Sequence, residues 1–250
     1  MSAELDELKD LTKSLRRRVS LSDSSDWSHA SANSVAVKNV AVKNVGAKTA
    51  AISGSLDELA AKIHACRACP LGSQRLTAVP GSGNAKAEVM FIGEGPGFKE
   101  DHTGEPFVGR SGQLLDKIME AVGLLRSTVY IANIVKCHPM KNPADPESKG
   151  NDRPPSAAER EACRGWLDAQ IRAIKPRFIV TLGTVPAHVL LDETTPITKL
   201  RGQWREYDPG AGFPKIKLLP TFHPAALLRN PNLKRVVWED MKNLQKELSK

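Results

Sequence analysis

Four short runs of apolar residues divide the second part of the chain into regular segments. They read EVMFIG from residue 88, VYIANIV from residue 129, RFIVTLG from residue 177 and KIKLLPTF from residue 215. Between these runs the sequence is typical of helices, which we predict over 56–66, 111–123, 156–174, 184–191 and 234–248. Alternating strands and helices predict an α/β fold, in which a parallel sheet is covered by helices on both faces.

The ends of the predicted strands are the expected location of a binding site. In α/β folds, ligands bind beyond the carboxyl ends of the parallel strands. That rule selects GEGPG from residue 93, Asn133, LGT from residue 182 and Phe222-His223-Pro224. Taken alone, His223 is most simply a histidine that is hydrogen-bonded at a strand end, so its interpretation depends on the rest of the chain.

The first 55 residues follow a different pattern. Leu5, Leu8, Leu11 and Leu15 lie at helical spacing, while residues 19–55 are rich in Ser, Ala, Asn and Val and contain AVKNV twice in succession. We therefore predict an N-terminal helix and low-complexity tail over 1–55 and a folded domain over 56–250. The helix either docks on a partner protein or is a solvated appendage.

Composition narrows the class of protein. The chain has 36 Lys and Arg against 28 Asp and Glu, a net charge of +8, and this surplus favours a polyanionic partner such as nucleic acid. No run approaches the roughly 18 apolar residues of a membrane span, and the N-terminus lacks the apolar region of a signal peptide. We expect no membrane association and a cytoplasmic protein, whose cysteines stay reduced.

Four cysteines provide a candidate metal site. Cys66 and Cys69 form a Cys-x-x-Cys pair, to which Cys137 and Cys163 add two further thiolates. Structural zinc prefers a second close pair, whereas four thiolates of mixed spacing also suit an iron–sulfur cluster. The spacing alone leaves zinc, a cluster and unliganded core cysteines open.

The glycine-rich stretch over 92–115 is a candidate binding loop. It reads IGEGPGFKEDHTGEPFVGRSGQLL and contains neither the Gly-Lys-Ser/Thr ending of a P-loop nor the glycine spacing of a dinucleotide site. A nucleotide-cofactor enzyme is therefore disfavoured. The loop is long and carries Glu94, Glu100, Asp101 and Phe107 between its glycines, which favours a role in binding.

These motifs occur in an order that resembles the family 4 uracil-DNA glycosylases, the iron–sulfur branch of that group. The resemblance covers about residues 58–248 and is carried by Cys-x-x-Cys-Pro-Leu, Gly-Glu-Gly-Pro-Gly, TGEPFVGRSGQLL, Asn-Ile-Val-Lys-Cys, Ala-Cys-Arg and His-Pro-Ala-Ala-Leu-Leu. It implies a three-layer α/β/α sandwich with a central four-stranded parallel sheet. It also implies a structural [4Fe-4S] cluster on Cys66, Cys69, Cys137 and Cys163, and a monomer that hydrolyses the glycosidic bond of uracil in DNA and leaves an abasic site.

The resemblance also implies which residues bind the base. Uracil must be flipped out of the duplex and held by its face and its polar edge. Phe107 suits the face, and the amide of Asn133 matches the O4 and N3–H edge of uracil but not that of cytosine. Glu100 lies where the family has the wall that excludes the 5-methyl group of thymine. The alternatives are a strand-end turn residue at Asn133 and an ordinary loop carboxylate at Glu100.

The remaining expected roles concern catalysis and DNA. His223 would donate a hydrogen bond to uracil O2 as the base leaves as an anion. Leu227 would fill the gap left by the flipped nucleotide, although we expect at least one of Leu227 and Leu228 to pack on the core. Arg229 would contact phosphate. Glu94 would orient the attacking water; alternatively, it would brace its loop while backbone carbonyls position the water.

The segment over 138–162 departs from the family pattern. It reads HPMKNPADPESKGNDRPPSAAEREA, is longer than the usual loop, and is polar and proline-rich, which predicts an exposed extension. A related branch carries a loop histidine that traps the sugar covalently, but residues 139–155 contain no histidine, so we predict turnover; His138 is the nearest exception. Two alternatives to a glycosylase are a nonhydrolytic DNA-binding relative and a replication-associated module that docks through residues 1–18.

Overall fold

The four predicted apolar runs form the centre of one sheet. The computed structural model describes residues 52–250, so the predicted N-terminal helix and most of the predicted tail lie outside the described residues. The central strands are β2 (Val89–Gly93), β3 (Tyr130–Asn133), β4 (Phe178–Leu182) and β6 (Ile216–Thr221), and neighbouring strands among them pair in parallel. Nearly every residue of these strands is buried, as expected for a parallel sheet covered on both faces.

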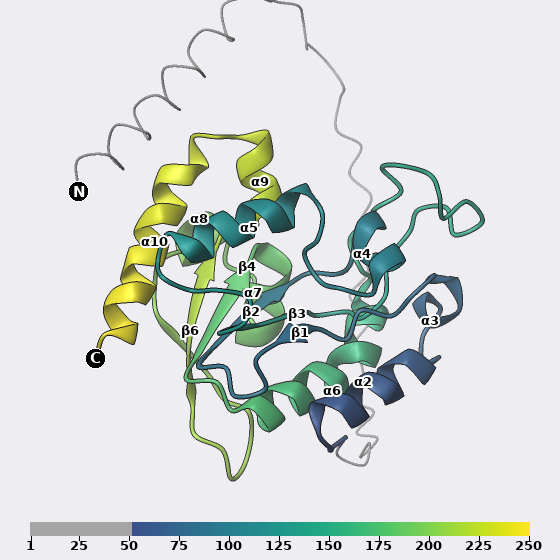
Figure 1. Ribbon diagram of the computed structural model, residues 1–250, viewed down its shortest axis with the longest axis horizontal. Helices are drawn as coiled ribbons and strands as arrows, with labels where there is room; N and C mark the ends of the chain where they lie inside the picture. The colour runs from purple at the N-terminus through teal and green to yellow at the C-terminus, as the bar shows by residue number, and fades with distance from the viewer. Residues whose placement is uncertain (1–51) are drawn as a thin grey trace, which may run out of the picture. The chain divides into compact units, whose positions relative to one another are not determined.

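The sheet has six strands rather than the four predicted. A two-residue strand, β1 (Ser82–Gly83), pairs antiparallel with β3, and a three-residue strand, β5 (Arg205–Tyr207), pairs antiparallel with β6. The order across the sheet is β1-β3-β2-β4-β6-β5. Figure 1 labels β1, β2, β3, β4 and β6. Both added strands are too short to show a hydrophobic period, and this explains why the sequence pattern did not reveal them.

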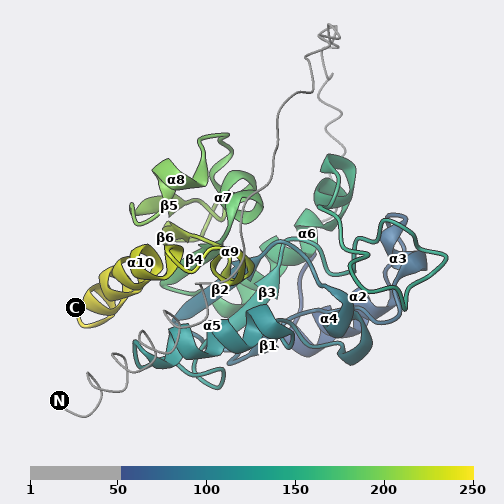
Figure 2. The same cartoon turned by 90° about the horizontal axis from the view of Figure 1, so that it is seen from above.

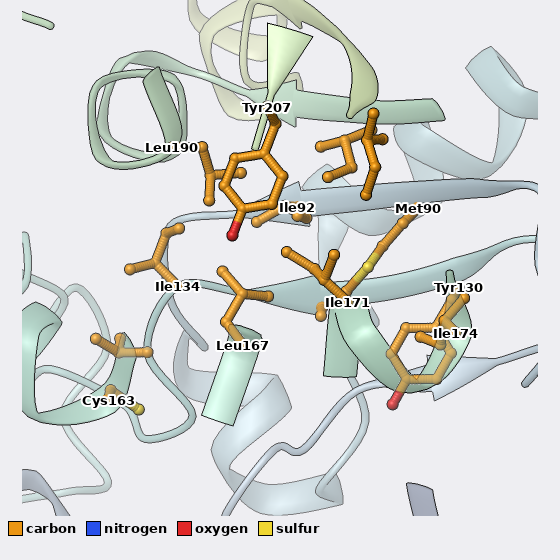
Figure 3. Close-up of a cluster of buried hydrophobic side chains, with 14 of the residues drawn as sticks. Met90, Ile92, Tyr130, Ile134, Cys163, Leu167, Ile171, Ile174, Leu190 and Tyr207 are labelled. Atoms are coloured by element: carbon orange, nitrogen blue, oxygen red, sulfur yellow. The ribbon is translucent and has the colours of Figure 1, made fainter. Parts of the chain in front are cut away.

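Helices cover both faces of the sheet, which confirms the predicted three layers. Successive residues of β2 point to opposite faces: Met90 and Ile92 join one apolar cluster, and Val89 and Phe91 join the other. The first cluster is completed by α2 (Leu56–Ala65), α6 (Ala157–Ile174) and α7 (Thr184–Leu191); Figure 3 shows part of it. The second is completed by α5 (Arg110–Glu120), α9 (Pro224–Arg229) and α10 (Leu233–Leu248).

Residues 52–250 contain the five helices that were predicted after residue 55, together with four shorter ones. Ser55 and Ser156 are the N-cap residues of α2 and α6, and each forms a capping box with the glutamate three residues later. The additional short helices are α3 (Leu71–Gln74), α4 (Phe98–Thr103), α8 (Ile197–Leu200) and α9. Both views place α2 and α6 side by side (Figure 1 and Figure 2). Within residues 52–250, no helix combines the length and apolar character needed to cross a membrane.

Candidate active site

A pocket opens at the carboxyl ends of the parallel strands, where the sequence predicted a site. It encloses about 510 Å³, including the space at its open mouth. Its lining residues are Gly95, Gly97, Glu100, Phe107, Ser111, Asn133, Asp152, His223 and Ala225. Four residues predicted from sequence, namely Glu100, Phe107, Asn133 and His223, therefore line the same pocket, although they come from three separate segments of the chain.

Asn133 lies at the end of β3 with only 1% of its surface exposed. Its side-chain Oδ1 has no hydrogen-bond partner, which is unusual for a buried polar atom. Gly93 makes room for this side chain, since a Cβ at Gly93 would lie 2.4 Å from Asn133 Oδ1 and 2.5 Å from the Phe107 ring. The arrangement leaves a buried acceptor available to a ligand that enters the pocket.

Phe107 forms an aromatic wall of the pocket. Its ring centroid lies 5.6 Å from that of His223, and the two planes are tilted by 30°. The backbone of Phe107 has a φ of 55°, in the left-handed region that residues with a Cβ rarely adopt. A phenyl face in a pocket that also holds polar side chains can stack on a flat heterocycle.

Glu100 is a fixed side chain. Its Oε1 accepts hydrogen bonds from the backbone N–H groups of Val108 and Gly109 at 3.0 and 3.1 Å, and its Oε2 accepts one from Gly97 at 3.2 Å. Glu100 is thus more than an ordinary loop carboxylate, because it ties the start of α4 to the loop before α5. The same bonds hold its carboxylate rigidly at the pocket.

His223 is the N-cap residue of α9, two residues beyond the end of β6. Its Nδ1 accepts a hydrogen bond from the backbone N–H of Ala225 at 3.1 Å, so the neutral ring carries its proton on Nε2. Burial, with a smaller effect of the nearby Arg229 charge, lowers the pKa of His223 to about 4. At neutral pH the imidazole is therefore an uncharged hydrogen-bond donor.

A groove adjoins the pocket and shares His223 with it. Glu94 and Arg229 line the groove rather than the pocket, and Asp152 lines both. Burial raises the pKa of Glu94, while the charge of Arg160 opposes this rise. The groove therefore places a carboxylate and an arginine beside His223.

Asp152 is a pocket residue that the sequence analysis did not identify. It lies in the extended segment after Cys137, and its Oδ1 lies 2.7 Å from His138 Nε2. His138 is fully buried, does not line the pocket, and has its Nδ1 3.5 Å from Asp101 Oδ2. Although burial lowers the pKa of His138, Asp101 and Asp152 outweigh it and raise that pKa to about 9. No sequence motif indicated Asp152, because its position depends on this contact.

Leu227, the predicted DNA wedge, is buried rather than exposed. Leu227 is 1% exposed and packs in the second apolar cluster, between the sheet and α5. The next residue, Leu228, is 42% exposed. In a helix these two side chains point about 100° apart, so only one of them faces the core. The expectation that at least one of the pair packs on the core is confirmed.

The four cysteines line a second, smaller cavity between α2, α3 and α6. Its walls contain Cys66, Cys69, Cys137 and Cys163 together with Arg75 and Lys136. Arg75 Nη1 lies 2.8 Å from Cys137 Sγ, and the backbone N–H of Lys136 donates to Cys163 Sγ at 3.3 Å. The fold thus brings together cysteines that are up to 97 positions apart in the sequence, from Cys66 to Cys163.

The cavity suits a group that is held by four thiolates. Zinc holds all four sulfurs at about 2.3 Å from one centre. An iron–sulfur cluster spreads its thiolates over different irons, so four cysteines around a common cavity suit it, and the donors on Cys137 and Cys163 match the hydrogen bonds that tune such clusters.

Cys137 and Cys163 are poor candidates for a free nucleophile. Burial raises the pKa of the Cys163 thiol to about 11, and burial also raises that of Cys137. Without a metal these thiols stay protonated at neutral pH, whereas a reactive cysteine needs a lowered pKa.

Comparisons with known proteins agree with this geometry. A sequence model described as the Uracil DNA glycosylase superfamily matches residues 80–242. Three relatives bear the name type-4 uracil-DNA glycosylase. The protein of Saccharolobus solfataricus is 41% identical over 78% of this chain and 87% of its own length. Those of Sulfurisphaera tokodaii and Thermotoga maritima are each 40% identical over 76% of this chain and 84% and 92% of their own lengths.

Proposed function

Because the chain belongs to the type-4 branch of the uracil-DNA glycosylase superfamily, we propose that it removes uracil from DNA by hydrolysing the N-glycosidic bond. The products are free uracil and an abasic site. The observation that carries this proposal is the buried Oδ1 of Asn133, which has no partner and lines a pocket together with Phe107, Glu100 and His223.

Base recognition follows from the shapes and polarities of three side chains. Asn133 accepts the N3–H of uracil with Oδ1 and donates to O4 with its amide, a pairing that cytosine cannot complete. Phe107 stacks on the face of the flipped base. Glu100, fixed by its three backbone amides, is the wall against which the 5-methyl group of thymine would collide.

Catalysis rests on charge that develops as the bond between C1′ and N1 breaks. Uracil leaves as an anion, and the Nε2–H of His223 donates a hydrogen bond to O2. A neutral imidazole suits this role, because its lowered pKa keeps it from protonating substrate groups in the ground state while its N–H still stabilises the anion. The bond from Ala225 to Nδ1 maintains the required tautomer.

Water attacks C1′ from the groove beside His223. We assign its orientation to Glu94, which follows β2 and lines this groove. Asp152 is the second carboxylate within reach, since it lines the groove and the pocket. His138 is fully buried and does not line the pocket, which supports turnover rather than covalent trapping of the sugar.

The groove is the proposed path of the DNA strand. Arg229 at the end of α9 would contact a phosphate. Leu228, rather than Leu227, is the residue of this pair exposed enough to fill the gap left by the flipped nucleotide. The partner is uracil-containing DNA, and the proposal retains a monomer in the cytoplasm, in keeping with cysteines that remain reduced.

The proposed cofactor is a [4Fe-4S] cluster on Cys66, Cys69, Cys137 and Cys163. When bound, such a cluster would cross-link the chain and take no part in the chemistry, because hydrolysis transfers no electrons. The support is the cavity that these cysteines share and the hydrogen bonds to two of their sulfurs.

The test is excision from defined oligonucleotides. The full chain is incubated with single-stranded and duplex DNA that contains one uracil, heated in alkali, and examined for cleavage at the abasic site. Matched oligonucleotides with thymine or cytosine at that position should stay intact. An uncleaved uracil strand that is nevertheless bound would favour the nonhydrolytic alternative, and a covalent adduct in denaturing gels would favour trapping.

A further inference from the structure

Arg126 makes an unusual set of contacts to the loop that carries Phe107. It lies in the connection between α5 and β3, outside the pocket. Its Nη1 donates to the backbone carbonyl of Pro106 at 3.0 Å, and its Nη2 donates to the carbonyl of Phe107. Its Nε donates to Asp116 Oδ1 on α5 at 2.7 Å. One guanidinium thus binds two successive carbonyls and is aimed by one carboxylate.

The backbone at Phe107 needs such support. A φ of 55° is unfavourable for a residue with a Cβ, and it persists only where the surroundings hold it. The Phe107 carbonyl also presses onto α5 at Gly112, where a Cβ would lie 1.7 Å from its oxygen. On the other side, the ring lies against Gly93 and 5.6 Å from the His223 ring. A change in the backbone of Phe107 would therefore move the ring.

We propose that Arg126, oriented by Asp116, is a positioning residue that holds Phe107 in its left-handed conformation and so fixes the face on which the base stacks. This inference rests on the proposed function, in which Phe107 stacks on uracil. The planar fork of arginine is required, because an ammonium group cannot donate to both carbonyls and to Asp116 in this geometry.

As a surface ion pair, Arg126 and Asp116 should contribute little to the stability of the fold. The side chains of Arg126 and Asp116 are 33% and 34% exposed, and ion pairs of this kind have small effects on stability. The contribution of Arg126 should therefore appear in base binding. Arg177 provides a matched control, since it pairs with Glu88 at 2.8 Å and donates to the Glu247 carbonyl at the opposite end of β4.

The experiment measures inhibition by free uracil and single-turnover excision for Arg126→Met, Arg126→Lys, Asp116→Asn and Arg177→Met. We expect Arg126→Met to weaken both uracil inhibition and excision by about tenfold, with little recovery in Arg126→Lys and a smaller loss in Asp116→Asn. Arg177→Met should match wild type. Equal losses in Arg126→Met and Arg177→Met, or full activity in Arg126→Lys, would overturn the inference.

A double-mutant cycle with Phe107→Ala separates positioning from general loss of structure. If Arg126 acts through Phe107, then Arg126→Met should cost less than about twofold once the ring is absent. An undiminished loss in the Phe107→Ala background would contradict the inference, and Asp116→Asn serves in the same cycle if Arg126→Met does not fold. A wild-type chain that excises no uracil would overturn the proposed function instead, which keeps the two failures distinct.

Discussion

His223 and Asn133 contact the same proposed base but should differ in when their contacts matter. Asn133 meets the uracil edge as soon as the base enters the pocket, whereas His223 faces charge that develops only as the base departs. Their substitutions should therefore separate binding from chemistry.

We expect His223→Ala to lower the single-turnover rate by roughly a hundredfold or more while affinity for uracil-containing DNA changes little. Asn133→Ala should weaken both affinity and rate and should reduce the preference for uracil over cytosine. The rates are measured with enzyme in excess, because slow release of the abasic product would mask the chemical step. A normal rate in His223→Ala would mean that His223 only caps α9.

The pH dependence of the rate tests Glu94. A carboxylate must be ionised to orient water, and burial raises the pKa of Glu94, so the rate should fall with decreasing pH already above the ordinary carboxyl pKa of 4.5. His223 should add no loss until pH approaches 4, since its pKa is lowered to about 4 and it stays neutral above that pH. The measurement is the single-turnover rate from pH 4 to 8.

Glu94→Gln should be slow across this range and should lack the acid limb of the profile. Asp152→Asn is the comparison, because Asp152 lines the same groove and its pKa is lowered, chiefly by the hydrogen bond with His138. If Glu94→Gln retains the limb while Asp152→Asn loses the rate, the water is held at Asp152.

The pattern of strands by itself identifies only the site residues that follow strand ends. Asn133 and His223 follow buried apolar runs, so their place at the carboxyl edge of the sheet follows from the pattern alone. Asp152 and Arg126 follow no such run. Asp152 reaches the pocket through an exposed extension that is anchored by His138, and Arg126 contacts Phe107 from 19 positions away. Neither contact produces a periodic pattern in the sequence.

At the scale of elements, α9 shows how the start of a helix decides which of two adjacent leucines faces the core. The resemblance implied a wedge role for Leu227, and we expected at least one of Leu227 and Leu228 to pack on the core; the structure buries Leu227 and exposes Leu228. That depends on where a six-residue helix begins, and the cap at His223 sets it. The strands were predictable because parallel strands are apolar throughout, whereas β1 and β5 are too short to show a pattern.

The two leucines of α9 should have opposite phenotypes. Leu227→Ala should destabilise the fold by about 2 to 5 kcal/mol, as expected for a buried leucine. Leu228→Ala should change stability by less than about 0.5 kcal/mol but slow excision from duplex more than from single-stranded DNA, because only the duplex leaves a gap to fill. Thermal unfolding and excision from both substrates test this, and equal duplex and single-strand losses in Leu228→Ala would remove its wedge role.

The cysteine cavity joins elements that are distant in sequence, so its occupant should be visible and stabilising. Purified protein should be brown, with broad visible absorbance and equal amounts of iron and inorganic sulfide. Cys66→Ser should lose the colour and lower the melting temperature, while protein that still folds retains selectivity for uracil. Colourless wild-type protein with stoichiometric zinc would show that the cluster assignment is wrong.

At the scale of the whole molecule, the glycosylase chemistry should be confined to the part after residue 51. Every proposed site residue lies between Cys66 and Arg229. Deletion of residues 1–51 should therefore change the excision rate by less than about tenfold, which corresponds to roughly 1.4 kcal/mol in the barrier. A larger loss would make the N-terminal segment part of the active enzyme.

The stability of the truncated protein should depend on the residue at which the deletion ends. Ser55 caps α2, with its hydroxyl accepting from the Glu58 N–H at 3.3 Å and its own N–H donating to the Glu58 carboxylate at 3.0 Å. Deletion of residues 1–55 should thus cost about 1 kcal/mol of stability relative to deletion of residues 1–51. Since α2 ends directly before Cys66, the longer deletion should also lose iron more readily to a chelator.

The short outer strands of the sheet should limit aggregation at high protein concentration. Exposed strand edges can recruit further chains and seed aggregates, and this risk grows with the length of unpaired backbone. Here the sheet ends on one side in the two residues of β1 and on the other in the three residues of β5, both antiparallel to their neighbours. A chain that would bind to either edge finds too few backbone groups to form a ladder, so concentrated protein should resist fibril growth from its native state.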